Sequence, residues 1–356
     1  MKKLRRVLAI TMLWYLRLGP LVKLATALTV IVGAGTAVYQ FYSTISAEGA
    51  RREAAAALIK QADSQLQGKD YALSWDANAK ALELSPHDAA AMAQQARIAM
   101  AWLEDVRTSS KPGATTFGDI VVPLQDALVA RATQPAVRGA ELADIKAHIG
   151  WARFLRSRDG VTGLRISEEF NEALQIDPDN MYGHVMKGFF ILWQGGRPQD
   201  ARADFDAALQ SRVDPPYRDR MILAALFNSD GDEYRFAAIE YANRIRKSGR
   251  TIDLESRRHL LWYYEVGIDD IEYLTRLARV IPSDEHIAML DWLLTDLGDP
   301  LRRGNDNVLK AWFMEQAGQK PEALALYRQL VATTPPQSGS RAAELARSGI
   351  RRLSGK

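Results

Sequence analysis

The residues that could do chemistry are scattered along this sequence and do not group at the spacings that build a site. The chain has 356 residues and no cysteine, which excludes disulfides, thiolate metal sites and cysteine nucleophiles. No nucleophile elbow, phosphate-binding loop or zinc-protease motif stands in a suitable context. The sequence therefore predicts no catalytic residue, no metal site and no cofactor. The five histidines lack the spacing of metal ligands and are expected at the surface or in a groove: His87, His148, His184, His259 and His286.

One stretch comes close to a calcium-binding loop. Asn228, Asp230 and Asp232 have the alternation of oxygen ligands that such a loop uses. The glycine of that loop would fall at Glu233 and its closing glutamate at Ile239, so the match fails. An enzyme whose site is assembled from distant residues stays an open alternative, because no spacing would reveal it.

A helix, turn, helix pattern recurs along the chain and is clearest over residues 168–209. Phe170 and Ala173, near the end of one predicted helix, return as Phe205 and Ala208, 35 residues later. A helical unit with this period is typical of a solenoid, in which each repeat packs on its neighbours. The helix end also recurs as an apolar residue five positions before a proline: Ala81 before Pro86, Ala173 before Pro178 and Leu330 before Pro335.

The segment over residues 168–209 resembles a tetratricopeptide repeat (TPR). The resemblance implies an all-α, right-handed superhelical solenoid of TPR-like helix pairs over residues 50–352, with a concave inner face. At about 34 residues per unit, roughly eight pairs fit in this range. Residues 108–123 break the helical periodicity with two glycines and two prolines, and we expect an inserted loop there, most simply a solvent-exposed connector. Between residues 215 and 299 the repeat signature fades, which indicates divergent helix pairs.

The repeat also varies in its first and last units. Ser74 and Asn78 stand where a later unit has Ala201 and Phe205, so the first unit is degenerate. A final helix with four arginines, over residues 341–353, suits the exposed end of a solenoid. The other helices that we expect cover residues 51–67, 71–84, 215–228, 232–247, 257–266, 269–280 and 284–297.

The resemblance implies that the first helix of each pair lines a concave, protein-binding groove. Aromatic and methionine side chains in a groove suit an extended or helical peptide of a protein partner. The tryptophans Trp151, Trp193 and Trp312 could equally pack between helices, and both interpretations stay open. The residues that the resemblance places in the groove are His148, Trp151, Met186, Phe190, Trp193, Val308, Trp312 and Gln316.

The N-terminus predicts a membrane anchor. Residues 1–23 are basic and include a short apolar stretch suited to an interfacial helix. Residues 24–42 carry no formal charge and span roughly 28 Å as a helix, close to the thickness of the bilayer core. Six basic residues precede this transmembrane helix and three follow it within 18 residues. The excess predicts a single-pass protein of a bacterial inner membrane, with the solenoid in the periplasm.

One face of the predicted span carries small residues at intervals of four. Ala25, Thr29, Gly33 and Ala37 would let a second helix approach closely, since packing drives helix association in lipid. We therefore expect a possible transmembrane helix partner, which is either a second copy or a larger membrane protein. The alternative is that small residues are simply common in such spans.

The charge distribution narrows the class of partner. The formal net charge is +3, but six of the 46 basic residues lie in the first 23 positions, which contain no acid. The rest of the chain has 40 basic and 43 acidic residues, and this balance disfavours a nucleic-acid partner. The sequence thus predicts a membrane-anchored TPR scaffold that recruits protein partners in envelope assembly, chaperone or secretion machinery. A cytoplasm-facing TPR adaptor with the opposite topology is the first alternative, and an envelope enzyme is the second.

Overall fold

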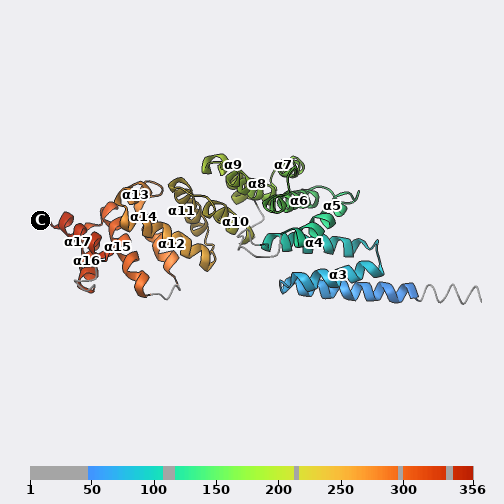
Figure 1. The fold of residues 1–356 in the computed structure, drawn as a ribbon. Coiled ribbons are helices and arrows are strands. Elements are labelled where there is room, and N and C mark those ends of the chain that lie inside the picture. Colours follow the sequence, from blue (N-terminus) through green and yellow to red (C-terminus); the bar gives the residue numbers. More distant parts are fainter. Residues whose placement is uncertain (1–46, 107–116, 212–215, 296–299, 334–339, 356) are drawn as a thin grey trace, which may run out of the picture. The chain divides into compact units, whose positions relative to one another are not determined.

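The structure is a computed structural model that describes residues 47–106, 117–211, 216–295, 300–333 and 340–355 (Figure 1). These residues form sixteen helices joined by turns, with no strand among them. The predicted interfacial helix, the transmembrane helix over residues 24–42 and its small-residue face lie outside the described residues. Within the described part, none of the helices has the length and apolar character needed to cross a bilayer.

The described residues fall into two compact units, which divide between Ala101 and Trp102. The first unit contains a helix over residues 47–67, then α3 (Tyr71–Leu84) and most of α4 (Ala89–Asp105). The predicted bounds of α3 are confirmed. Its start is fixed by Asp70, whose side chain accepts a hydrogen bond from the Leu73 amide.

Polar residues replace the repeat's usual packing in this first unit. Ser74 is buried and donates a hydrogen bond of 2.7 Å to the carbonyl of Ala62. Asn78 is buried and donates one of 3.0 Å to the carbonyl of Ala91. The degenerate positions therefore hold neighbouring helices together through hydrogen bonds to backbone rather than through an aromatic ring.

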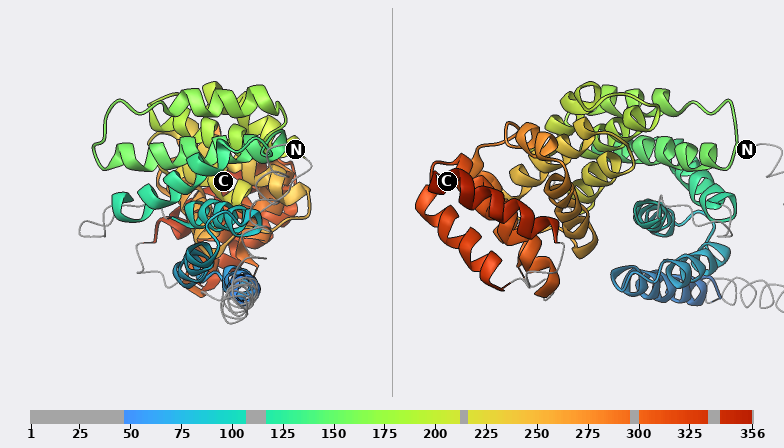
Figure 2. Two further views of the ribbon diagram at one scale, coloured as in Figure 1. Left: turned by 90° about the vertical axis from the view of Figure 1, so that its right-hand side faces the viewer. Right: turned by 60° about the vertical axis from the view of Figure 1, so that its left-hand side comes forward.

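The second unit stacks its helices in two layers (Figures 1 and 2). Neighbours α6, α8, α10 and α12 contact one another in sequence and form the first layer, while α9, α11 and α14 contact one another in the second. At the C-terminal end α15, α16 and α17, in orange and red, lie side by side (Figure 2). The helices are α5 (Phe117–Ala132), α6 (Ala140–Arg158), α7 (Ile166–Ile176), α8 (Met181–Trp193), α9 (Pro198–Gln210), α10 (Pro216–Phe227), α11 (Asp232–Lys247), α12 (Leu254–Asp269), α13 (Ile271–Leu277), α14 (Ser283–Leu294), α15 (Pro300–Gln316), α16 (Lys320–Thr333) and α17 (Arg341–Ser354).

A glycine in one helix facing an aromatic ring in the next is the recurring contact of this stack. A Cβ atom on Gly150 of α6 would lie 2.7 Å from the ring of Phe170 on α7, closer than packed atoms come. Gly188 of α8 faces Phe205 of α9 in the same way. The aromatic residues that reveal the repeat in the sequence are thus fully buried because glycine lets the helices approach.

The expected loop over residues 108–123 is partly wrong. Its last seven residues belong to α5, which contains Pro123 within the helix. Val121, Leu124 and Leu128 lie at helical spacing and are fully buried. The burial of this apolar stripe outweighs the hydrogen bond that proline removes from the helix. Residues 108–116 of the expected loop lie outside the described residues, so the role of the loop stays a prediction.

The divergent region is helical, as expected, with shifted boundaries. The predicted helix over residues 232–247 is confirmed as α11. Gly267, which falls between the predicted helices over residues 257–266 and 269–280, lies inside α12. A Cβ atom there would lie 2.8 Å from Leu274, so this glycine permits α13 to pack closely and does not end the helix.

Candidate functional site

Two neighbouring cavities mark the surface of the second unit where α8, α10 and α12 meet. Their volumes are 150 Å³ and 420 Å³, and Asn228 lines both, so we call them together the α10 groove. The smaller cavity is lined by Phe189, Leu192, Trp193, Ala225, Asn228 and Ser229. The larger is lined by Glu104, Asp105, Val106, Arg220, Met221, Ala224, Phe227, Asn228, Asp253, Glu255, Ser256 and His259.

Helix α8 presents an exposed tryptophan to the smaller cavity. The helix begins at Asn180, whose side chain accepts a hydrogen bond of 2.7 Å from the Gly183 amide, and it ends at Trp193. Trp193 is 44% exposed. One side of its ring meets the edge of Phe154, with 5.5 Å between ring centroids, and the guanidinium of Arg158 lies 4.6 Å from its centroid. The tryptophan is thus held in place while part of its apolar surface remains open.

An aromatic stack joins α10 to α12 in the larger cavity. Phe227 and His259 lie face to face, with 4.5 Å between ring centroids and 8° between planes. Burial lowers the pKa of His259, although the charge of Glu255 acts in the opposite direction. The ring is therefore neutral at pH 7. Beyond it Trp262 is 46% exposed and lies under the guanidinium of Arg235, at 5.3 Å.

The remaining wall of the larger cavity is acidic. Arg220 binds Asp105 at 3.5 Å and donates a hydrogen bond of 2.8 Å to the Glu104 carbonyl. Asp253 caps α12, accepting hydrogen bonds of 2.9 Å and 2.8 Å from the amide and hydroxyl of Ser256. Glu255 follows in the first turn of the same helix and is exposed. Four carboxylates therefore line this cavity together with a single arginine.

A buried polar layer behind the groove fixes the end of α4. His148 of α6 is fully buried and lies 3.3 Å from the carboxylate of Glu104, while its other ring nitrogen donates to the Asp144 carbonyl at 2.7 Å. The indole of Trp151 donates to the Leu103 carbonyl at 3.2 Å. These contacts hold Glu104 and Asp105 in position at the rim.

The structure separates the residues that we expected in a concave groove. Only Trp193 and Gln316 are exposed, and Gln316, at the end of α15, is not among the residues that line the α10 groove. Trp151 and Trp312 are packed between helices, which is the alternative that the sequence left open. Buried side chains at first-helix positions fill the space between the layers and present no surface to a partner. The six buried residues are His148, Trp151, Met186, Phe190, Val308 and Trp312.

Sequence reasoning missed Phe227 and Trp262 because they lie where the repeat signature fades. One signal was available. Trp193 ends α8 and Phe227 ends α10, so two successive first helices of the stack both end in a large aromatic residue. An aromatic residue repeated at one structural position on adjacent helices indicates a shared surface.

The larger cavity holds one serine and one histidine, Ser256 and His259. Among the described residues no cluster of acids and histidines has the geometry of a metal site. The hydroxyl of Ser256 donates to the capping Asp253. His259 makes ring contacts but no hydrogen bond within the described part of the chain, so it does not contact that hydroxyl through a hydrogen bond. What remains is an apolar aromatic surface beside carboxylates.

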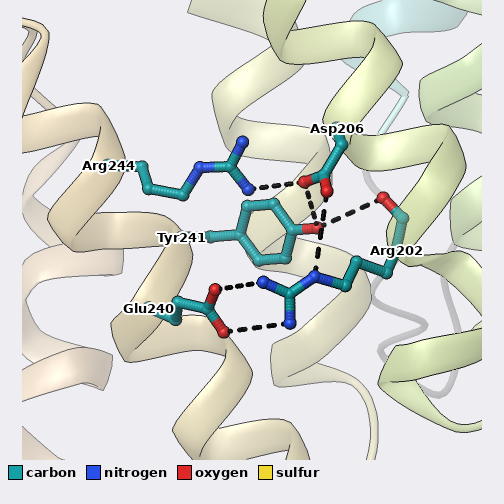
Figure 3. A network of polar contacts seen from close by, with 5 residues as sticks. All are labelled: Arg202, Asp206, Glu240, Tyr241 and Arg244. Atoms are coloured by element: carbon teal, nitrogen blue, oxygen red, sulfur yellow. Dashed lines mark hydrogen bonds and ion pairs between the residues drawn. The ribbon is translucent and has the colours of Figure 1, made fainter. Parts of the chain in front are cut away.

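The opposite layer carries a closed network between α9 and α11 (Figure 3). Arg202 pairs with both Glu240 and Asp206, and Arg244 also pairs with Asp206. The hydroxyl of Tyr241 donates to Asp206 at 3.1 Å. A cavity of 270 Å³ adjoins this network. Arg202 and Glu240 line it and pair with each other, and Glu233 lines it as a third charged residue.

Comparison with known proteins adds one structural likeness. No protein-family model matches this chain, and no curated protein matches it. Among solved structures the chain is similar to a tetratricopeptide repeat protein from Parabacteroides merdae, with 10% sequence identity and a TM-score of 0.39. The match covers 85% of this chain and 100% of that chain.

Proposed function

We propose that this chain is a membrane-anchored, TPR-like scaffold whose α10 groove binds a segment of a partner protein. The observation that carries the proposal is the exposed Trp193 at the edge of a cavity, next to the aromatic stack on α10 and α12. Large aromatic residues at the centre of a surface are the side chains that contribute most to protein binding. Trp193 is exposed and lines a cavity, and such a position suits the binding of an apolar side chain.

Membrane attachment is the second part of the proposal and depends on the uncharged stretch over residues 24–42. An anchored scaffold raises the effective concentration of partners held at the same membrane. We propose recruitment for envelope assembly, chaperone or secretion machinery at a bacterial inner membrane, with the helical body in the periplasm. Association of the span through Gly33 and its neighbouring small residues would add a transmembrane helix partner.

Topology can be tested by protease digestion of spheroplasts that express the full-length chain at a low level. Digestion of the helical body without lysis supports the periplasmic assignment. Protection until lysis would instead place the body in the cytoplasm and favour the adaptor with the opposite topology. Replacement of Gly33 by isoleucine should weaken crosslinked oligomers of the span if its small residues pack against a second helix.

The groove can be tested by selecting peptides from a random 12-residue display library on the full-length chain in nanodiscs. We expect enriched peptides whose binding is weakened about thirtyfold by Trp193→Ala, a typical effect of a central aromatic residue. The Leu73→Ala variant is the control, because Leu73 is 53% exposed and belongs to the first unit. Equal binding to both variants, or no enrichment at all, would refute the groove as the binding site.

A further inference from the structure

The charge of the larger cavity indicates which kind of segment the α10 groove accepts. Glu104, Asp105, Asp253 and Glu255 line it with Arg220 as the only arginine or lysine. Because Arg220 already pairs with Asp105, its charge offsets one of the four carboxylates. The cavity therefore carries an excess of negative charge.

The other contacts of these carboxylates do not remove that excess. Asp253 accepts hydrogen bonds from Ser256, and such bonds from neutral groups orient the carboxylate while leaving its charge in place. The helix dipole at the start of α12 contributes about half a positive charge near Asp253 and Glu255. Glu255 has no ion-pair partner among the described residues, and the nearby His259 is neutral at pH 7.

The apolar lining beside the carboxylates suits the stem of a long basic side chain. Met221 and the stacked rings of Phe227 and His259 line the same cavity. Arginine packs on aromatic faces while its guanidinium binds carboxylates, often through two parallel hydrogen bonds. The chain already uses this chemistry nearby, because Arg158 lies over Trp193 and its guanidinium is 4.6 Å from the ring centroid.

We propose that the α10 groove binds a protein segment carrying an arginine or lysine, whose charged end lies at Glu255 and Asp253. An adjacent apolar side chain of the same segment occupies the smaller cavity, against Trp193 and Phe189. This inference rests on the proposed function, since it names the chemistry of the partner at the same groove. The two cavities meet at Asn228, so one short segment can reach both.

The test uses the peptide selection described above, on the full-length chain in nanodiscs, with two charge-reversal variants. Glu255→Lys changes the cavity, and Glu322→Lys is its matched control. Both glutamates are exposed and lie in the first turn of a helix, so the two variants lose the same favourable interaction with a helix dipole. Glu322 lies on α16 and does not line the groove.

The wild-type chain should enrich peptides in which arginine or lysine stands next to an apolar residue. For the strongest of these, Glu255→Lys should raise the dissociation constant about tenfold, and Glu322→Lys should leave it within about twofold. Replacing the peptide's basic residue with glutamine should remove the effect of Glu255→Lys. Raising the salt concentration should weaken the binding of the basic peptide and leave the binding of the glutamine peptide unchanged.

The outcomes distinguish a failure of this inference from a failure of the proposed function. Enriched peptides without basic residues, weakened by Trp193→Ala but not by Glu255→Lys, would overturn the basic-segment inference and leave the groove as a binding site. Enrichment of acidic peptides would overturn it as well. Peptides insensitive to Trp193→Ala, or no enrichment, would overturn both proposals.

Discussion

The two layers of the second unit use charged residues in different ways. Between α9 and α11, Asp206 and Glu240 pair with arginines of the same chain, so the network is closed (Figure 3). In the larger cavity of the α10 groove, four carboxylates face one arginine, and the exposed Glu255 has no ion-pair partner among the described residues. Both surfaces adjoin cavities, so cavity volume does not distinguish them.

This difference distinguishes charged residues that hold two helices together from charged residues that are open to another molecule. A charged side chain whose partner lies on the adjacent helix fixes how the two helices meet, and it has little left to offer another molecule. In the α10 groove, Glu255 has no such partner among the described residues. The comparison therefore favours the α10 groove, and not α9 and α11, as the proposed recognition surface.

The largest expected effect distinguishes two tryptophans that the sequence could not separate. Trp312 is 4% exposed and Trp193 is 44% exposed. Removing a buried tryptophan side chain costs about 3–5 kcal/mol, so Trp312→Ala should strongly lower the free energy of unfolding, measured by urea denaturation followed by circular dichroism. Trp193→Ala should lower the free energy of unfolding by about 1 kcal/mol or less and weaken peptide binding about thirtyfold. Similar losses of stability in both variants would contradict the division between packing and binding.

The next largest effect is a pH dependence of the free energy of unfolding that comes from the buried His286. His286 is fully buried, donates to the Leu277 carbonyl at 3.1 Å and accepts from the Tyr264 hydroxyl at 2.8 Å. Burial lowers the pKa of His286 from 6.5 to about 4, although the Leu277 bond opposes the change. Because the unfolded chain binds this proton more readily, stability is full above pH 6.5 and falls by about 3 kcal/mol as the pH drops to 4.

The measurement is the free energy of unfolding from pH 7 to pH 4 for the wild type and for His286→Gln. The difference between their free energies of unfolding should shrink as the pH falls.

His184→Gln should show the opposite pH dependence. Burial lowers the pKa of His184, but its bonds to Asp204 and to the Pro178 carbonyl, both at 2.8 Å, raise it overall. Its contribution is therefore present below pH 6.5 and lost as the pH rises through the folded value. A pH-independent difference for His286→Gln would show that the ring is not buried as described.

The smallest effect concerns the closed network. Glu240→Gln removes a charge that pairs with Arg202, but the arginine is 52% exposed, so the loss of stability should be at most about 1 kcal/mol. Peptide binding should not change. Glu322→Gln, at an exposed position without an ion-pair partner among the described residues, is the control. Loss of peptide binding in Glu240→Gln alone would move the recognition surface to α9 and α11.

Sequence periodicity predicted the helices well because it reports the residues that face the core. Phe170 and Phe205, which reveal the 35-residue period, are fully buried, and α3 and α11 have the predicted bounds. The predicted helix boundaries were wrong where they depended on a single proline or glycine. Pro123 lies inside α5, and Gly267 lies inside α12, because apolar contacts along each helix outweigh the local preference.

The candidate site was harder to predict from sequence. A position on the first helix of a pair does not tell whether its side chain points between layers or outward, so Trp151 and Trp193 looked alike. The carboxylates of the groove come from α4 and α12, about 150 residues apart in the chain, and no local motif links them. Only the packing of α10 between α8 and α12 brings the two aromatic residues Trp193 and Phe227 to one surface.

Hydrogen–deuterium exchange of the full-length chain in nanodiscs, with and without a selected basic peptide, tests the central claim most directly. Binding at the α10 groove should slow exchange at the last turn of α8, at the end of α10 with residues 228–229, and in the first turns of α12. Exchange in α9 and α11 should not change, because their charged residues pair with each other. Slower exchange in α9 and α11, with none at the groove, would contradict the assignment of recognition to this surface.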